Sequence, residues 1–303
     1  MIPPTFDYLV PATLPEAIAL LHEHGDEAKV LAGGHSLIPA MRLRFAEPSH
    51  LIDISHIPGL DYVREEGGFL KIGTMAREVV LKDLPWISER YPLLVDTTKM
   101  IADPQVRNLA TVGGNLAHGD PANDHPATML AYRAEIEITG ASGARIVPID
   151  EFFTDFFTTA LEHGEILTEI RIPIPPSRSG GCYLKVERKV GDYAAAAVAV
   201  QLSLAADGSI EQAGIGLTNV AALPTRAVDA ENALRGQQPS DALFAQAGQL
   251  AADASSPADD LRGSAEYKLT LIRELIQRAL RRSVERAQGR KARFGKIIFS
   301  EKS

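Results

Sequence analysis

Apolar positions early in the chain follow a helical spacing over 14–21 and then form a short, largely apolar run over 28–32. They recur on one face over 14–21, a Thr13–Glu16 capping box precedes them, and Gly25 ends the pattern, which predicts an amphipathic helix. A short buried strand is predicted over 28–32, and it runs into Gly33-Gly34 and a helix over 37–42. Strand, glycine turn and helix in succession present backbone amides to an anion.

The pattern from 51 to 172 mixes short strands with helices. It predicts strands over 51–54 and 166–172, hairpins over 60–72 and 135–147, and helices over 77–100 and 127–132. The hairpins turn at Gly67-Gly68 and at Ser142-Gly143.

Prolines and glycines cluster over 172–181, and the pattern changes beyond them. We expect strands over 182–188, 194–204 and 210–217, the last two joined as a hairpin, and then helices near 226–235, 240–252 and 264–287. The sequence therefore predicts two domains, 1–176 and 177–303, the second built from a three-stranded antiparallel sheet with helices.

Composition removes several classes of function. The 303 residues suit two domains, and 39 acidic against 31 basic residues give a net charge of −8, which argues against sequence-independent nucleic-acid binding. Cys182 is the one cysteine, so an internal disulfide or an iron–sulfur cluster held by this chain is excluded. The sequence shows neither a membrane span nor a signal peptide, and a cytoplasmic location is expected.

Two glycine pairs about eighty residues apart carry the chemistry: AGGHS at 32–36 and TVGGN at 111–115. Glycine lets the backbone come close to a ligand and adopt positive φ, so converging amides could hold a pyrophosphate, with hydroxyl and amide donors from Ser36, Thr111 and Asn115 at the edges. The alternative is that each pair is only a tight turn. Neither a GxGxxG nor a Walker A sequence occurs.

Two further features allow a functional interpretation but favour a structural one. His118, Asp120, Asp124 and His125 lack the spacing of a known metal motif, so no metal site is predicted, and Asp124 is better assigned to a ribityl or ribose hydroxyl. The basic stretch 281–303 is typical of a solvated helix end, and docking onto an acidic partner subunit is the alternative.

AGGHSLIPAMRLR at 32–44, IADPQVRNLATVGGNLAHGDPANDHPA at 101–127 and GDYAAAAVAV at 191–200 together resemble the medium, flavin-binding subunits of molybdenum hydroxylases of the xanthine dehydrogenase family. The resemblance covers nearly the whole chain. It implies an α+β fold: a vanillyl-alcohol-oxidase-type (PCMH-type) FAD-binding domain in two subdomains, followed by a smaller domain with a three-stranded antiparallel sheet and helices.

The resemblance also implies the residues that contact FAD. Two loops hold the pyrophosphate and single residues contact the rest of the cofactor: Lys29, Val30, Leu31, Ala32, Gly33, Gly34, His35 and Ser36; Thr111, Val112, Gly113, Gly114 and Asn115; and Ile101, Asp124, Leu167, Lys185 and Tyr193. Taken singly, Ile101 and Leu167 could be core residues, Lys185 a solvated strand lysine and Tyr193 a packing residue. No catalytic side chain is assigned.

The implied complex contains a large molybdopterin subunit, a small [2Fe-2S] subunit and this chain, as a dimer of heterotrimers. FAD would take electrons from the [2Fe-2S] subunit and pass them to a quinone or similar acceptor, and the complex could associate peripherally with the inner face of the cytoplasmic membrane. HGDPANDHPA at 118–127 resembles the members that oxidise carbon monoxide, whereas sister enzymes acting on aromatic or N-heterocyclic substrates more often have an alanine-rich loop.

Two rival interpretations remain open. A self-sufficient FAD oxidase of the vanillyl-alcohol type would need its own substrate pocket, for which the chain is short, and often has a covalently attached flavin. A non-enzymatic nucleotide-binding module would use the same loops and contain no flavin.

Overall fold

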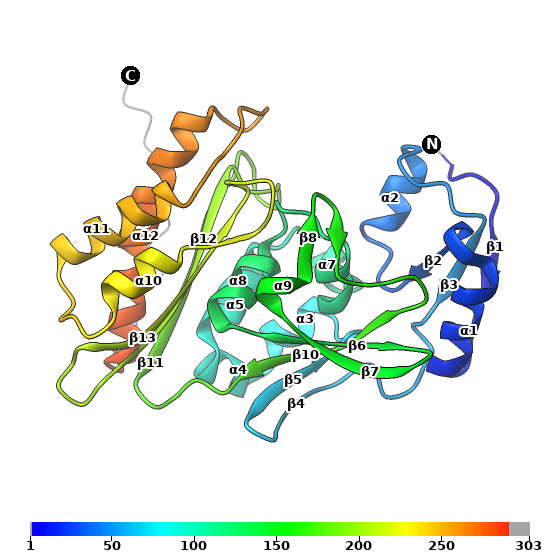
Figure 1. Ribbon diagram of the computed structural model, residues 1–303, viewed down its shortest axis with the longest axis horizontal. Helices are drawn as coiled ribbons and strands as arrows, with labels where there is room; N and C mark the ends of the chain where they lie inside the picture. The colour runs from blue at the N-terminus through cyan, green and yellow to red at the C-terminus, as the bar shows by residue number, and fades with distance from the viewer. Residues whose placement is uncertain (1, 291–303) are drawn as a thin grey trace.

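The computed structural model describes residues 2–290, which form an elongated molecule of three successive parts (Figure 1). The N-terminal lobe is a parallel sheet of order β1-β3-β2 with two helices. Its elements are β1 (Asp7–Leu9), α1 (Leu14–His24), the 3-10 turn η1 (Gly25–Glu27), β2 (Ala28–Leu31), α2 (Leu37–Arg42) and β3 (His50–Asp53). The capping box is confirmed in part, since Thr13 accepts a hydrogen bond from the Glu16 amide at 3.3 Å.

The central part is a five-stranded antiparallel sheet of order β4-β5-β10-β6-β7. Its strands are β4 (Val63–Glu66), β5 (Phe69–Gly73), β6 (Glu135–Gly140), β7 (Gly143–Pro148) and β10 (Ile166–Pro173). Both predicted hairpins are confirmed. The first turns at Gly67 and Gly68, whose φ of 62° and 86° explains the choice of glycine there.

Helices and short strands connect this sheet to the rest of the chain. They are α3 (Glu78–Asp83), α4 (Pro85–Arg90), α5 (Pro92–Met100), α6 (Pro104–Arg107), α7 (Val112–Ala117), α8 (Asp124–Tyr132), α9 (Ile149–Phe152), β8 (Phe153–Asp155) and β9 (Thr158–Thr159). The helical region expected over 77–100 is thus three helices, because Pro85 and Pro92 each start a new one.

The C-terminal part is an antiparallel sheet with helices over its outer face (Figure 1). It consists of β11 (Ser179–Val186), β12 (Ala196–Leu204), β13 (Ile210–Thr218), β14 (Thr225–Arg226), α10 (Val228–Leu234), α11 (Asp241–Asp253) and α12 (Ala265–Ala287). The three long strands and three helices are confirmed, but the sheet has four strands. The prediction missed β14 because two residues are too few to show alternation.

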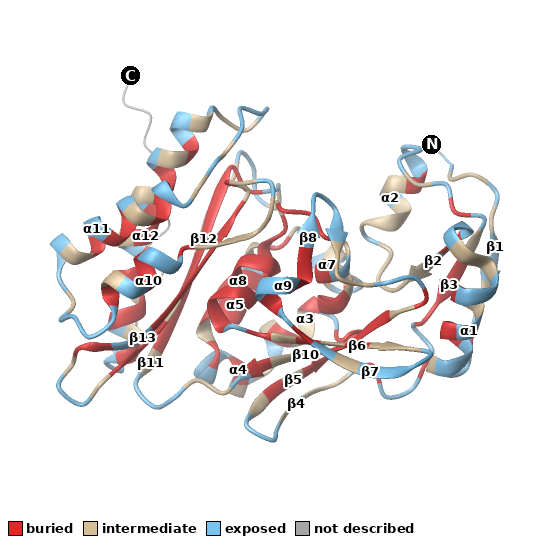
Figure 2. Cartoon of the chain, viewed as in Figure 1, coloured by how far each residue is buried: buried red, intermediate tan, exposed pale blue. Residues whose placement is uncertain are grey.

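The inner face of this sheet packs closely on α8. A Cβ at Gly216 would lie 2.6 Å from the Ala127 carbonyl carbon, and one at Gly214 would lie 2.9 Å from that of Ala131. Only glycine permits this approach of helix backbone to strand. The buried core is continuous across the junction (Figure 2), since Tyr183 and Ala199 belong to the same hydrophobic cluster as the central sheet. The domain boundary at 176/177 stays a prediction.

The described part of the basic C-terminal stretch is paired within the chain. Arg286 donates to Asp96 at 2.6 Å and also to the Gly181 carbonyl, and Arg281 donates to Asp241 at 2.8 Å. The interpretation of Arg286 as a solvated helix end is therefore wrong, because it joins α12 to α5. Residues 291–303 of that stretch lie outside the described residues. Within the described range, no helix has the length and apolar character that a bilayer crossing requires.

Candidate functional site

The first glycine pair, Gly33-Gly34, follows β2 and opens α2, as expected. Within residues 2–290, the amides of 33–37 form no backbone hydrogen bond, and Gly34 has a φ of 73°. A cavity of about 460 Å³ lies against this turn; residues 31–35, Ile38, Pro39 and Arg42 line it. Free amides around a cavity of this kind can bind an anionic group.

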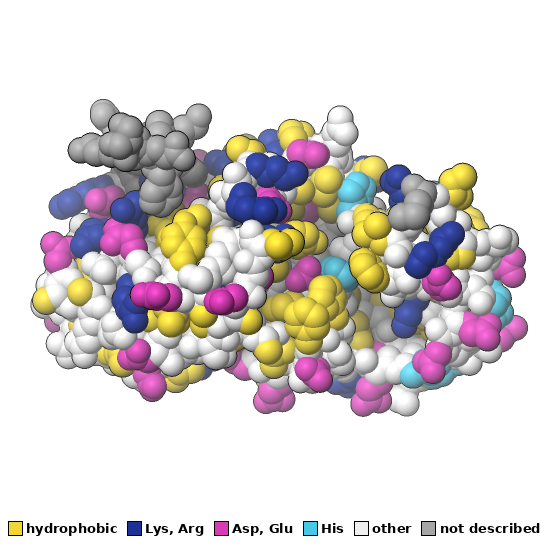
Figure 3. All heavy atoms as spheres, turned by 90° about the horizontal axis from the view of Figure 1, so that it is seen from above, with side chains coloured by type: hydrophobic (Ala, Val, Ile, Leu, Met, Phe, Trp, Pro, Cys, Tyr) yellow, Lys and Arg dark blue, Asp and Glu magenta, His cyan; other side chains and the backbone are white. Residues whose placement is uncertain are grey.

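The two glycine pairs converge. A Cβ at Gly33 would lie 2.5 Å from the Leu109 carbonyl oxygen and 3.0 Å from the Thr111 amide, and one at Gly114 would lie 3.8 Å from the Ala32 Cβ. The strand end after β2 and the start of α7 are therefore in direct contact. The molecule seen from above is hollowed between the N-terminal lobe and the central part (Figure 3), which is where these segments meet.

The second glycine pair, Gly113-Gly114, differs from the expected turn. It lies in the first turn of α7, neither glycine has a positive φ, and Thr111 caps the helix by accepting from the Gly114 amide at 3.1 Å. The amides of Val112 and Gly113 donate to the carbonyls of Ala76 and Thr74, at 2.9 and 3.2 Å. The expectation that this pair offers free amides from a positive-φ turn is wrong, because a helix start has formed instead.

Packing explains the second pair. A Cβ at Gly113 would overlap the Thr74 side chain and lie 2.7 Å from the Thr74 Cα. Gly113 is thus required for α7 to lie against the strand end of β5. Next to it, the Oδ1 atom of Asn115 is buried and has no partner among the described residues. An unpaired buried acceptor beside the convergence of the two segments suits a ligand that donates a hydrogen bond.

Asp124 forms the centre of a buried polar cluster at the start of α8. Its Oδ1 accepts from the Tyr183 hydroxyl at 2.5 Å and its Oδ2 from Lys185 Nζ at 3.0 Å. Lys185 also lies 3.4 Å from Glu187 and donates to the Met100 carbonyl at 3.2 Å. Burial raises the pKa of Asp124 against the effect of Lys185, and burial also raises the pKa of Tyr183.

The remaining predicted contacts lie in different surroundings. Ile101 is 7% exposed and follows α5 in the same loop as Met100, whereas Leu167 belongs to the main hydrophobic cluster. Tyr193 is 42% exposed on the loop before β12, and Arg262 lies 5.5 Å over its ring. Lys29 and His35 are exposed, and the other residues of 30–36 are half-buried. Lys185 is not the solvated lysine of the alternative interpretation, because its side chain is 1% exposed.

The two histidines of the glycine-rich stretch serve separate roles. His125 is fully buried and its Nε2 lies 2.7 Å from Glu78 at the start of α3. His118 ends α7 and packs edge-on against Phe157, with ring centroids 5.2 Å apart, and burial lowers its pKa. Within the described residues, the His, Cys, Asp and Glu side chains form no group of three or more that could hold a metal ion.

Two residues of the site were missed by the sequence analysis. Arg42 lines the cavity, although no basic residue lies in the first glycine turn itself. Its spacing of four from Ile38 places both on one face of α2, which was the available signal. Tyr183 precedes Lys185 by two on β11, so strand alternation puts both side chains on the face that meets Asp124.

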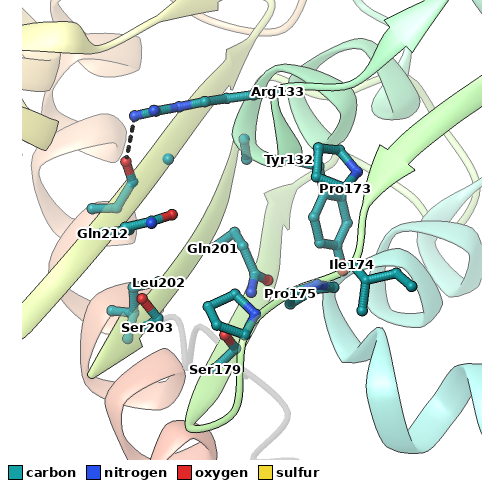
Figure 4. A pocket seen from close by; sticks show the side chains of 14 residues that line it. Tyr132, Arg133, Pro173, Ile174, Pro175, Ser179, Gln201, Leu202, Ser203 and Gln212 are labelled. Carbon is teal, nitrogen blue, oxygen red and sulfur yellow. Dashed lines mark hydrogen bonds between the residues drawn. The ribbon is translucent and has the colours of Figure 1, made fainter. Parts of the chain in front are cut away.

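A second cavity, of about 280 Å³, lies at the other end of α8, against the linker over 173–176 (Figure 4). Three polar atoms that are buried and unpartnered within residues 2–290 belong to its lining: Tyr132 Oη, Ser179 Oγ and Gln201 Oε1. Tyr132 at this cavity is eight residues along α8 from Asp124, a rise of about 12 Å. It is therefore a separate feature, of the kind that buried water commonly fills.

Known families match both halves of the chain. Residues 4–175 match the family described as the FAD binding domain in molybdopterin dehydrogenase, and residues 181–283 match the CO dehydrogenase flavoprotein C-terminal domain. The carbon monoxide dehydrogenase medium chain of Hydrogenophaga pseudoflava is 45% identical over 284 residues, which cover 92% of this chain and 97% of that protein.

A solved structure and a second relative extend the comparison. The structure of carbon monoxide dehydrogenase from Hydrogenophaga pseudoflava that lacks the Mo-pyranopterin moiety superposes with a TM-score of 0.92 at 46% identity, over 94% of this chain and 99% of that chain. The 6-hydroxypseudooxynicotine dehydrogenase complex subunit alpha of Paenarthrobacter nicotinovorans is 34% identical over 288 residues, covering 95% of this chain and 97% of that protein.

Proposed function

The chain belongs to the family of FAD-binding medium subunits of the molybdenum hydroxylases, and from this we propose that the converging glycine pairs hold FAD between the N-terminal lobe and the central sheet. It is an FAD-containing oxidoreductase subunit of a multi-subunit complex. The observation that carries the proposal is the contact of Gly33, which lines the cavity, with residues 109–111, which lead into the second glycine pair.

The residues present fit the cofactor. Free amides over 33–37 and the hydroxyl of Ser36 would hold the pyrophosphate, Asn115 Oδ1 would accept from the ribityl or ribose part, and Arg42 adds a cation to the cavity wall. The other contacts that the family implies are proposed for residues 29–32, Ile101, residues 111–114, Asp124, Leu167, Lys185 and Tyr193. Leu167 would act as a buried support rather than at an open surface.

FAD supplies electron chemistry when bound, and the chain holds it and shields it. Asp124, Tyr183 and Lys185 form a rigid polar cluster that fixes the junction of α8 with β11. Cys182 is buried, and burial raises the pKa of its thiol to about 12, so it is not a reactive thiolate at neutral pH. We propose that a large partner subunit supplies the molybdenum centre and a small one the iron–sulfur clusters, in a dimer of such heterotrimers.

The substrate of the whole complex is proposed to be carbon monoxide. Two relatives named carbon monoxide dehydrogenase medium chain are 45% and 44% identical, against 34% for a relative named for a nicotine derivative. A flavin subunit of a sister molybdenum hydroxylase is the second candidate. Purification of the native complex and assay with carbon monoxide and with N-heterocycles would separate them, since oxidation of a heterocycle without any activity on carbon monoxide contradicts the first assignment.

The acceptor is proposed to be a quinone or similar molecule, reached by peripheral association with the inner face of the cytoplasmic membrane. Quinones partition into the bilayer, so a complex that reduces them must reach its surface. Co-sedimentation of the native complex with quinone-containing vesicles tests this proposal. Reduction of water-soluble acceptors alone, with no vesicle binding, would contradict it.

The flavin is proposed to be non-covalently bound. Unfolding of the purified chain should then release all of its FAD to the filtrate. Flavin that stays attached to the unfolded polypeptide would favour the rival oxidase of the vanillyl-alcohol type, and a chain that neither contains nor takes up FAD would favour the non-enzymatic nucleotide-binding module.

A further inference from the structure

The loop after α5 has an unusual backbone. Ala102 has a φ of 41°, a conformation that glycine adopts readily and that asparagine or aspartate can support with a side-chain hydrogen bond. Alanine has no such group. The surrounding structure must therefore hold this residue in place.

Cations from two parts of the molecule bind the three carbonyls of this loop. Arg107 Nη1 donates to the carbonyl oxygens of Ile101 and Ala102, at 2.6 and 3.2 Å. Lys185 Nζ donates to that of Met100 at 3.2 Å. Within residues 2–290 no carboxylate pairs with Arg107, so its hydrogen bonds serve the backbone of this loop.

The local sequence explains how Arg107 reaches back. Asp103 caps α6 by accepting from the Val106 amide at 2.9 Å, and Pro104 starts the single turn. This turn reverses the chain and places Arg107 under the residues that precede it. From the opposite side, Gly191 closes the loop in, because a Cβ there would lie 2.8 Å from the Ala102 carbonyl oxygen.

This loop contains one proposed flavin contact, bonds to a second and packs against a residue that lies near a third in the sequence. Lys185 joins it to Asp124, Gly191 lies two residues before Tyr193, and the loop itself contains Ile101. Ile101 is 7% exposed and lies outside the three hydrophobic clusters of the described residues.

We infer that Arg107 is a positioning residue for the flavin: it holds the Met100–Asp103 loop in a strained conformation that keeps Ile101 against the ring and turns two carbonyl dipoles away from it. The inference rests on the proposed function. Because Arg107 bonds to the carbonyls of residues 101 and 102 and not to the free amides of 33–37, it is expected to tune the flavin without being needed to retain it.

The test compares the flavin midpoint potential of purified variants by equilibration with redox dyes, together with FAD content and visible spectrum. Arg107→Ala should keep the wild-type FAD content and lower the potential, because freed carbonyl oxygens disfavour the electron-rich reduced ring. A tenfold change in the ratio of reduced to oxidised flavin corresponds to about 30 mV for a two-electron couple. Arg107→Lys should shift it less.

Two further variants separate position from charge. Gly191→Ala displaces the same loop without removing a charge and should also shift the potential. Arg90→Ala, which removes a surface arginine paired with Glu65, should leave it unchanged. A shift of the flavin potential in Arg107→Ala without a shift in Gly191→Ala would contradict the proposal that Arg107 acts by positioning the loop.

Failure of the inference is distinguishable from failure of the proposed function. A wild-type chain that holds FAD, with an Arg107→Ala variant of unchanged potential and spectrum, overturns only the inference. If Arg107→Ala does not fold or hold FAD, the Arg107→Lys variant is used instead. An unchanged flavin potential in Arg107→Lys then overturns the inference. A wild-type chain that never holds FAD removes the proposed function as well.

Discussion

The first glycine pair leaves its amides unpaired beside a cavity, whereas the amides at the second pair are already used within the protein. The missing side chain faces protein at both pairs, since Gly33 packs on the backbone of residues 109–111 and Gly113 packs on Thr74. Both pairs allow close packing, but only the first pair also leaves backbone amides without a partner among the described residues. The same two letters thus answer different physical demands.

The largest expected effect tests the packing role of the second pair. Gly113→Val forces a side chain into the Thr74 backbone, and we expect a loss of about 3 kcal/mol in the free energy of unfolding, the upper end for overpacked cores. Urea unfolding followed by circular dichroism measures it. The double variant with Thr74→Ala should recover part of the loss, since it removes the overlapping side chain. Wild-type stability in Gly113→Val would contradict this role.

The next effect tests the binding role of the first pair. Gly33→Ala pushes the two segments apart by meeting the Leu109 carbonyl, and we expect FAD affinity to fall about tenfold or more, roughly 1.4 kcal/mol, with a smaller loss of stability than Gly113→Val. Fluorescence titration of the apoprotein with FAD measures the affinity. Gly59→Ala is the control, because it adds backbone strain with no neighbour within 4 Å and should keep FAD affinity. Equal affinity in all three proteins would refute the contrast.

A matched pair of hydroxyl deletions sharpens the comparison. Thr111 caps α7 through its side chain, so Thr111→Ala should cost about 1 kcal/mol of stability. Ser36 stands at the corresponding position before α2 but makes no capping bond, so Ser36→Ala should leave thermal stability unchanged and weaken FAD binding. Thermal unfolding of the apoproteins separates the two. A larger stability loss in Ser36→Ala than in Thr111→Ala would reverse the assignment.

The smallest expected effect is a difference in acid sensitivity. Burial lowers the pKa of His118 at the end of α7, so the unfolded chain takes up the proton first as the pH falls below about 6.5, and this contribution to stability is lost from there downward. Asp53 ends β3, next to β2. Burial alone would raise the pKa of Asp53, but hydrogen bonds from the Tyr8 hydroxyl and the Ser55 amide lower it. Its contribution is therefore lost only below about pH 3.9.

Thermal unfolding from pH 7 to pH 3 follows both groups. The difference between wild type and His118→Gln should change between pH 6.5 and 5, and that between wild type and Asp53→Asn only near pH 4 and below. Coincident profiles for the two variants would show that the regions do not differ in this way.

Much of the fold followed from local pattern. The Thr13 cap of α1, the glycine hairpin of β4 and β5, and the long strands β11 to β13 each follow from a few adjacent residues, and all formed. The family resemblance, and with it FAD, came from motifs in the same way. Short elements such as β14 carry too little pattern to be predicted.

What failed depends on contacts between distant residues. The residues near Gly113 in the sequence do not predict its contact with Thr74. The helical start of α7 also uses amides that a turn would have left free. Arg286 lies in a basic stretch of the kind that is usually solvated. Its Nη1 nevertheless lies 2.6 Å from Oδ2 of Asp96, which is 190 residues away in the chain. Arg42 and Tyr183 required the face of a helix or strand to be combined with the final packing.

The most direct measurement is the FAD stoichiometry of the purified chain after reconstitution, compared between wild type and Gly33→Ala. If two distant glycine segments meet to form one flavin site, wild type binds one FAD per chain, releases it on unfolding, and Gly33→Ala binds far less while keeping its circular dichroism spectrum. A folded wild-type chain that takes up no flavin, or a Gly33→Ala variant that binds it as tightly, would contradict the account.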